Sequence, residues 1–107
     1  TGLCMSIEVA DDPFFTNNFE KKMFQHAFEL KYEVLARVPF LEKNIAVGSV
    51  NLHLDTFGKS FNISSKGEKV YSGCIGIGFE RLALCFYSQF GCDLDLWPKR
   101  LKQILAI

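Results

Sequence analysis

Alternating apolar and polar residues predict β-strands along this chain. Side chains of a strand point in turn to opposite faces of a sheet, so alternation separates a buried face from an exposed one. Such alternation occurs in residues 30–38, 47–55 and 70–79, and a shorter strand is expected at residues 5–9. The side chains that we expect to face the core are Leu30, Tyr32, Val34, Ala36, Val38, Val50, Leu52, Leu54, Ile75, Ile77 and Phe79.

Apolar residues that recur every three or four positions predict helices before, between and after these strands. A first helix is expected from about residue 17, with Asn17 or Asn18 as its N-terminal cap. A second helix is expected over residues 80–90, and a last one begins near Pro98, because proline suits the first turn of a helix. The apolar stripe of the second helix consists of Leu82, Cys85, Phe86 and Phe90.

The order of these elements indicates the fold class. Strands joined by tight turns, with helices on one side, predict an α+β fold built on an antiparallel sheet. No internal repeat, low-complexity tract or linker divides the chain, so residues 1–107 are expected to form a single domain. One face of the sheet should pack on the helices, and the other should form an open floor.

Composition adds little about partners. With 49% hydrophobic residues the chain can build a core, and its four cysteines form no CxxC pair, so disulfides are not expected. Lys and Arg total 12, as do Asp and Glu, which argues against a dedicated nucleic-acid-binding module. No apolar segment approaches the roughly 20 residues that span a bilayer, so we expect no membrane partner and a cytoplasmic location.

The polar floor of the predicted sheet carries two glycines one residue apart. Glycine inside a strand costs stability and leaves a bare patch, on which a planar ring or a ribose can lie. Arg81 follows at the start of a helix, and guanidinium is the group best shaped to grip phosphate oxygens. The pattern therefore predicts a nucleotide on the sheet, with its phosphates held by Arg81. The residues expected on this floor are Glu33, Ser49, Asn51, His53, Asp55, Cys74, Gly76 and Gly78.

Each of these features also has a purely structural interpretation. The glycines can mark a bulge or a close strand crossing. Glu80 and Arg81, at the start of a helix, can simply cap the helix and face the solvent. A lone Cys74 is typical of a small buried hydrophobe. Glu33 can be half of a surface ion pair with Lys31 or Arg37. The spacing G-x-G-x-E-R inside a strand is, in any case, not that of a Rossmann dinucleotide site.

The segment "GIGFER", followed by an apolar helix, resembles motif 3 of the class II aminoacyl-tRNA synthetases. The segments "IEVADDPFF", "LKYEV", "SVNLHLDTFG" and "CIGIGFER…FGCDLDLWP" appear in the order found in amino acid:[carrier protein] ligases, which are truncated relatives of atypical seryl-tRNA synthetases. The resemblance covers most of residues 7–98. It implies that the chain is the C-terminal portion, with motif 3, of a class II synthetase catalytic domain.

The resemblance implies a two-step reaction. Such enzymes activate a small amino acid, here glycine, alanine or serine, with ATP and Mg²⁺ to an aminoacyl adenylate. They then pass the aminoacyl group to the phosphopantetheine thiol of an acyl carrier protein instead of to tRNA. It further implies that Arg81 is catalytic, that Ser49 and Asn51 lie near the amino acid, and that ATP is bound by Gly76, Gly78, Glu80 and Arg81.

The resemblance also implies a zinc ion at the catalytic site. Two cysteines and a glutamate hold it, and the fourth tetrahedral position is free for the substrate's amino group. Glu33 within "LKYEV" matches the glutamate ligand, and Cys74 matches the later cysteine. The earlier cysteine has no counterpart, since Cys4 comes too late and in the wrong context. Two ligands alone make a weak site.

Departures from the family pattern leave alternatives open. Motif 1, which builds a dimer interface in the complete enzyme, and motif 2, whose arginine holds the α-phosphate, have no counterpart, so this chain alone is expected to lack full activity. Residues 45–48 lack the glutamate of typical seryl-tRNA synthetases, which favours the carrier-protein branch and makes tRNA an unexpected partner. The alternatives are an atypical seryl-tRNA synthetase fragment and a non-catalytic remnant that binds a nucleotide or a partner.

Overall fold

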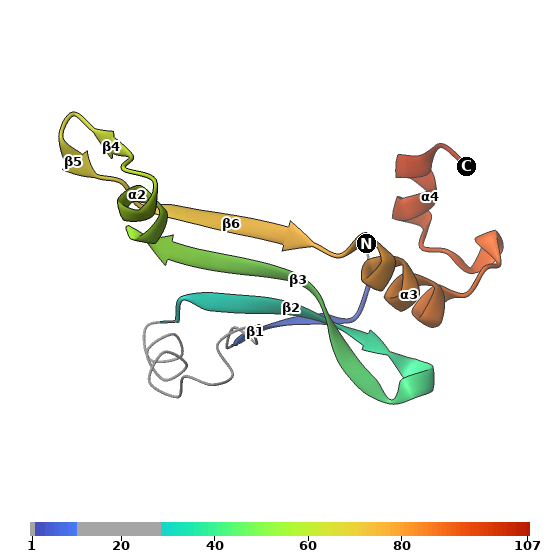
Figure 1. Cartoon of the computed structure of the whole chain (residues 1–107). Helices are drawn as coiled ribbons and strands as arrows, with labels where there is room; N and C mark the ends of the chain where they lie inside the picture. Colours follow the sequence, from blue (N-terminus) through green and yellow to red (C-terminus); the bar gives the residue numbers. More distant parts are fainter. Residues whose placement is uncertain (1, 11–28) are drawn as a thin grey trace.

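A four-stranded antiparallel sheet, in the order β1-β2-β3-β6, forms the centre of the fold (Figure 1). The computed structural model describes residues 2–10 and 29–107. The sheet's strands are β1 (Met5–Val9), β2 (Lys31–Val38), β3 (Lys43–Leu54) and β6 (Ser72–Ile77). The predicted α+β fold with an antiparallel sheet is thereby confirmed. The helix expected from residue 17 falls on 17–28, which lie outside the described residues.

The remaining elements lie at the two ends of the sheet (Figure 1). One end carries α2 (Thr56–Ser60) and the small hairpin of β4 (Ser64–Ser65) and β5 (Glu68–Lys69). At the other end lie α3 and α4, which confirm two predicted helices. Their bounds, with those of two short 3-10 turns, are α3 (Phe79–Phe90), α4 (Lys99–Leu105), η2 (Pro39–Leu41) and η3 (Leu94–Leu96). Within the described ranges no helix is long and apolar enough to cross a membrane.

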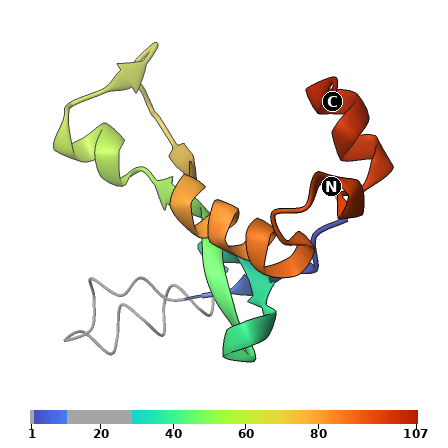
Figure 2. The same cartoon turned by 90° about the vertical axis from the view of Figure 1, so that its right-hand side faces the viewer.

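The core lies where α3 crosses β2 and β3, as Figure 2 shows. Its fully buried members come from all three elements, and partly buried neighbours pack around them. These residues are Ala36, Val38, Val47 and Cys85, with Val34, Ile45 and Leu82 around them. The far end of α3 is fixed by Gln89, whose amide donates to the Arg37 carbonyl at 2.8 Å. The predicted helix stripe is only partly right, since Phe86 packs edge-to-face on Trp97 instead of on the sheet.

A β-bulge in β3 explains why this strand is longer than its alternation predicts. Val34 pairs with Gly48, but Leu35 pairs with Ala46, so Val47 is an extra residue without a partner on β2. A bulge shifts the alternation by one position, which brings Ile45 and Val47 to the core together. The regular alternation resumes only after the bulge, so the sequence indicated a strand from residue 47 onward.

The apolar face of β6 is not covered by any described residue, which corrects the prediction for this strand. Ile75 and Phe79 are each 76% exposed and Ile77 is 57% exposed. Ile75 and Ile77 stand on the core face of the sheet, opposite Val50 and Gly48. However, α3 begins at the end of β6 and turns away over β2 and β3. Leu52 and Leu54, also expected in the core, are exposed as well.

The burial of Cys85 gives a direct test of this packing. Cys85 is fully buried between α3 and β2, and desolvation raises the pKa of its thiol, whereas Cys92 is exposed. Because the thiolate is the reactive form, iodoacetamide at pH 8 should label Cys92 within minutes and leave Cys85 unlabelled until the protein is denatured. Peptide mass mapping before and after denaturation measures both sites. Equal labelling of the two thiols in the native protein would contradict the position of α3.

Candidate functional site

The pairing of three strands places the predicted floor residues in two neighbouring rows. Residues directly opposite each other in antiparallel strands share a face of the sheet. The first row contains Lys31, Asn51 and Cys74, and the second contains Glu33, Ser49 and Gly76. Of the residues predicted to share this face, those in the two rows therefore do so, and Cys74 and Glu33 are on the same side.

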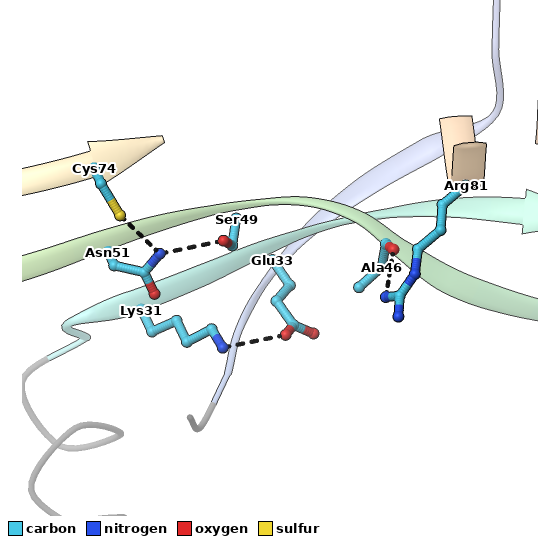
Figure 3. Close-up of polar contacts among 7 residues, drawn as sticks. All are labelled: Lys31, Glu33, Ala46, Ser49, Asn51, Cys74 and Arg81. Atoms are coloured by element: carbon cyan, nitrogen blue, oxygen red, sulfur yellow. Dashed lines mark hydrogen bonds and ion pairs between the residues drawn. The ribbon is translucent and has the colours of Figure 1, made fainter. Parts of the chain in front are cut away.

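Polar contacts connect the side chains within and between these rows (Figure 3). The amide Nδ2 of Asn51 donates to Ser49 Oγ at 3.2 Å and lies 3.4 Å from Cys74 Sγ, to which it also donates. The ammonium of Lys31 lies 3.5 Å from Glu33 Oε1. The interpretation of Glu33 as half of an ion pair is thus confirmed, with Lys31 as the partner. The amide of Asn51 fixes the Cys74 and Ser49 side chains relative to each other.

The surroundings of the glycines distinguish a bare floor from a close strand crossing. Among the described residues, a Cβ on Gly76 would meet only Ser49 Oγ, at an ordinary contact distance of 3.7 Å. A Cβ on Gly73 would come within 2.9 Å of the Asn51 carbonyl oxygen, and one on Gly48 within 3.0 Å of the Gly76 carbonyl oxygen. Close packing therefore requires glycine at Gly73 and Gly48. At Gly76 the sheet itself leaves room for a side chain, so the bare surface is available to a ligand.

Arg81 stands beside this bare surface because α3 starts at the end of β6. Gly78 precedes the helix, and its backbone N–H donates to the Val47 carbonyl at 2.8 Å. A Cβ on Gly78 would lie 3.6 Å from Arg81 Cδ, so the arginine stem passes next to the glycine. Nη1 of Arg81 donates to the Ala46 carbonyl at 3.1 Å (Figure 3). This bond orients the guanidinium, and its other N–H groups have no partner among residues 2–10 and 29–107.

A depression of about 340 Å³ joins these features on the polar face. It brings together the second row, the bulge of β3 and the start of α3. Two cations, Lys31 and Arg81, and one carboxylate, Glu33, line it over a floor that includes Gly76. The complete lining is Lys31, Glu33, Ala46, Val47, Gly48, Ser49, Gly76, Ile77, Gly78 and Arg81.

Two of the predicted floor residues lie elsewhere. His53 Nδ1 is 3.4 Å from Ser72 Oγ near the end of β3. Asp55 pairs with Lys59 at 2.9 Å and Lys69 at 3.7 Å in a separate hollow beside α2 and the β4–β5 hairpin. The hydrogen bond from Lys59, aided by both lysine charges, lowers the pKa of Asp55. Asp55 therefore pairs with lysines of α2 and β5 and does not line the depression.

The predicted zinc ligands share a face, but they do not form a metal site by themselves. Glu33 is bound to Lys31, and Cys74 to Asn51, with β3 between the two strands that carry them. Among residues 2–10 and 29–107 no group of three or more His, Cys, Asp or Glu side chains could hold a metal. The described residues alone do not fit zinc, so zinc with Glu33 and Cys74 as ligands stays a prediction.

Lys31 is the residue of this site that the sequence did not single out. It is 8% exposed, which is rare for lysine, and it lines the depression. The only available signal was its position two residues before Glu33, which places both on one face of a strand. The sequence treated it as a possible surface partner of Glu33.

Comparison with known proteins shows that the chain is similar to parts of amino acid ligases. It is 33% identical to amino acid–[acyl-carrier-protein] ligase 1 of Bradyrhizobium diazoefficiens, over 99% of this chain and 33% of that protein. It is 34% identical to the type-2 serine–tRNA ligase of Methanococcus aeolicus, over 89% of this chain and 19% of that protein. No protein-family model matches.

A solved structure agrees with these sequence matches. The structure of M. kandleri SerRS in complex with A. aeolicus tRNASec contains a chain that superposes with a TM-score of 0.74 and 28% identity, over 98% of this chain and 22% of its own length. The predicted resemblance and the partial class II synthetase domain are confirmed. The expectation that tRNA is not a partner is not supported, because serine–tRNA ligases and a tRNA complex are among the similar proteins.

Alanine substitutions at two glycines of β6 test the floor. Gly73→Ala should lower the free energy of unfolding by about 1–3 kcal/mol, because a backbone carbonyl occupies the space of the new methyl group. Gly76→Ala should change it by less than about 0.5 kcal/mol, since its methyl group makes only an ordinary contact with Ser49 Oγ. Denaturant unfolding of the full-length protein measures both. A loss at Gly76 as large as that at Gly73 would contradict an open floor.

Proposed function

We propose that this chain, a homologue of the class II aminoacyl-tRNA synthetase-like ligases, is the motif 3 part of an enzyme that activates a small amino acid as an aminoacyl adenylate and transfers it to a carrier protein. The observation that carries the proposal is the open surface at Gly76 beside the oriented guanidinium of Arg81. The match to amino acid–[acyl-carrier-protein] ligases over nearly the whole chain supports it.

The geometry suits the first half-reaction. The carboxylate of the amino acid attacks the α-phosphorus of ATP, and pyrophosphate leaves with its Mg²⁺. In the proposed arrangement the adenosine lies over Gly76 and Gly78, and Arg81 donates to the phosphate oxygens as negative charge shifts during the attack. Glu80, in the first turn of α3, is exposed beside Arg81 and stays a predicted ATP contact. Ser49 and Asn51, in the adjacent rows, would orient the amino acid.

In the second half-reaction a thiol replaces AMP. The thiolate of the carrier's phosphopantetheine attacks the carbonyl carbon of the adenylate, a thioester forms, and AMP leaves. The open floor gives such a long, flexible arm access to the carbonyl. The chain spans about a third of the carrier-protein ligases that it matches, so this activity is proposed for the full-length enzyme that carries the sequence. Its cytoplasmic location, its single-domain organisation and its dimeric state stay predictions.

A serine–tRNA ligase is the second candidate. Several type-2 serine–tRNA ligases are 32–34% identical to the chain, as close as the carrier-protein ligases. Both kinds of enzyme would form an aminoacyl adenylate, so the floor and Arg81 would have the same role in either. Only the acceptor of the aminoacyl group distinguishes them.

Pyrophosphate exchange tests the proposal in the full-length enzyme. We expect ATP–pyrophosphate exchange that depends on glycine, alanine or serine, and thioester formation on a carrier protein but no charging of tRNA. Arg81→Ala should lower exchange by about 100-fold, because a preorganised donor to the phosphate is lost. Arg100→Ala, on the exposed face of α4, should leave it unchanged and is the matched control.

Three results have distinct meanings. Charging of tRNA with serine would replace the carrier-protein proposal by the second candidate. Absence of exchange with all three amino acids would contradict ligase activity and favour a non-catalytic binding protein. Unchanged exchange in Arg81→Ala would remove Arg81 from the proposed role.

The zinc prediction has a measurement of its own. Cys74 and Cys92 are both free and exposed, but only Cys74 faces the floor. If zinc binds there with ligands from outside the described residues, Cys74→Ser should reduce the zinc content of the purified full-length protein to below about a tenth, and Cys92→Ser should not. Elemental analysis of both variants decides the point. Equal zinc in the two would exclude Cys74 as a ligand.

A further inference from the structure

Lys31 is a nearly buried cation at the edge of the depression. Its side chain is only 10% exposed, and Glu33 Oε1, at 3.5 Å, is its one partner within the described residues. Lysine is almost never so buried unless its charge is paired, because removing an ammonium from water is costly. A contact of 3.5 Å is longer than the 2.7–2.9 Å of a strong charge-assisted hydrogen bond. The Lys31 side chain is therefore mostly buried, and its contact with Glu33 is a long one.

The ammonium has donors to spare. It carries three N–H groups and no acceptor, and Glu33 takes one of them at most. The donors that Glu33 does not take can bind oxygen atoms of a ligand in the depression that Lys31 lines. The Glu33 side chain is more exposed than that of the lysine, at 28%.

The direction of the side chain shows where that acceptor would lie. Lys31 belongs to the row of Asn51 and Cys74, but its ion pair with Glu33 draws the ammonium toward the row of Ser49 and Gly76 (Figure 3). Lys31 and Arg81 thus both line the depression, one from β2 and the other from α3, with bare backbone at Gly76 in the floor. Two cations and one carboxylate leave the depression with a net positive charge, which suits an anionic ligand.

We propose that Lys31 is a second phosphate-binding residue, whose ammonium contacts an oxygen of the nucleotide phosphate across the floor from Arg81. Glu33 holds the lysine over the floor until the phosphate, a stronger acceptor, takes its donors. This inference rests on the proposed function and deepens it. It also gives Glu33 a positioning role toward Lys31 that requires no metal.

A pair of probes that differ only in the phosphate tests the inference. AMP and adenosine share the ring and the ribose, so calorimetric titration of the full-length protein with each isolates the phosphate contact. Lys31→Met should raise the Kd for AMP by roughly 10- to 100-fold, the range expected for a lost hydrogen bond to a charged group, and change that for adenosine less than about twofold. Lys31→Arg keeps the charge and should retain most of the AMP affinity.

Controls separate this role from a structural one. Lys43→Met removes an exposed lysine at the other end of the sheet and should change neither Kd. Lys31→Gln, which keeps a polar head group, replaces Lys31→Met if the latter fails to fold. Unchanged AMP affinity, or equal weakening of AMP and adenosine, overturns the inference while the proposed function stands. A wild-type protein that binds neither probe overturns both.

Discussion

The alignment of β2, β3 and β6 is the constraint on which the rest of the structure depends. Each floor residue faces the depression only because Glu33, Ser49 and Gly76 stand opposite one another. A shift of one residue in any strand would turn its side chains to the other face, and would exchange the polar floor for the apolar side of the sheet. Hydrogen bonds of the ladder alone do not select one register, because they form equally well in others. The core beneath α3 favours this register for β2 and β3, since it buries Ala36, Val38 and Val47 together.

The bulge at Val47 connects that core to the site. The Val47 side chain is buried beneath α3, while its carbonyl accepts the N–H of Gly78. The neighbouring carbonyl of Ala46 accepts Arg81 Nη1. Two successive peptide groups of the bulge thus fix both the start of α3 and the direction of the guanidinium. The packing of Val47 beneath α3 therefore positions Arg81, to which we assign the phosphate contact. A substitution that leaves a cavity under α3 should consequently shift the Arg81 guanidinium.

Much of the fold could be predicted from the sequence because alternation and helical spacing are local properties. They located β2, β6 and α3 and placed Glu33, Asn51 and Cys74 on one face. The bulge could not be predicted, since "IAVG" carries no alternation and the extra residue is defined only by its partner strand. The sequence also could not show that α3 covers β2 and β3 but not β6, because the direction of a helix depends on tertiary packing. Lys31 was missed because no pattern in the neighbouring sequence shows that a lysine is buried. In the segment "LKYEV" the family resemblance points to Glu33 instead.

The two faces of β6 tie the floor to whatever covers the other side of the sheet. β6 is an edge strand that pairs only with β3 within the described residues, and Gly76 gives it no side chain to pack on the polar face. Its remaining packing must come from Ile75 and Ile77, which are exposed here. Contiguous apolar surface of this kind is rarely left in water. The bare floor at Gly76, which suits a nucleotide, therefore leaves the side-chain packing of this part of β6 to its apolar face.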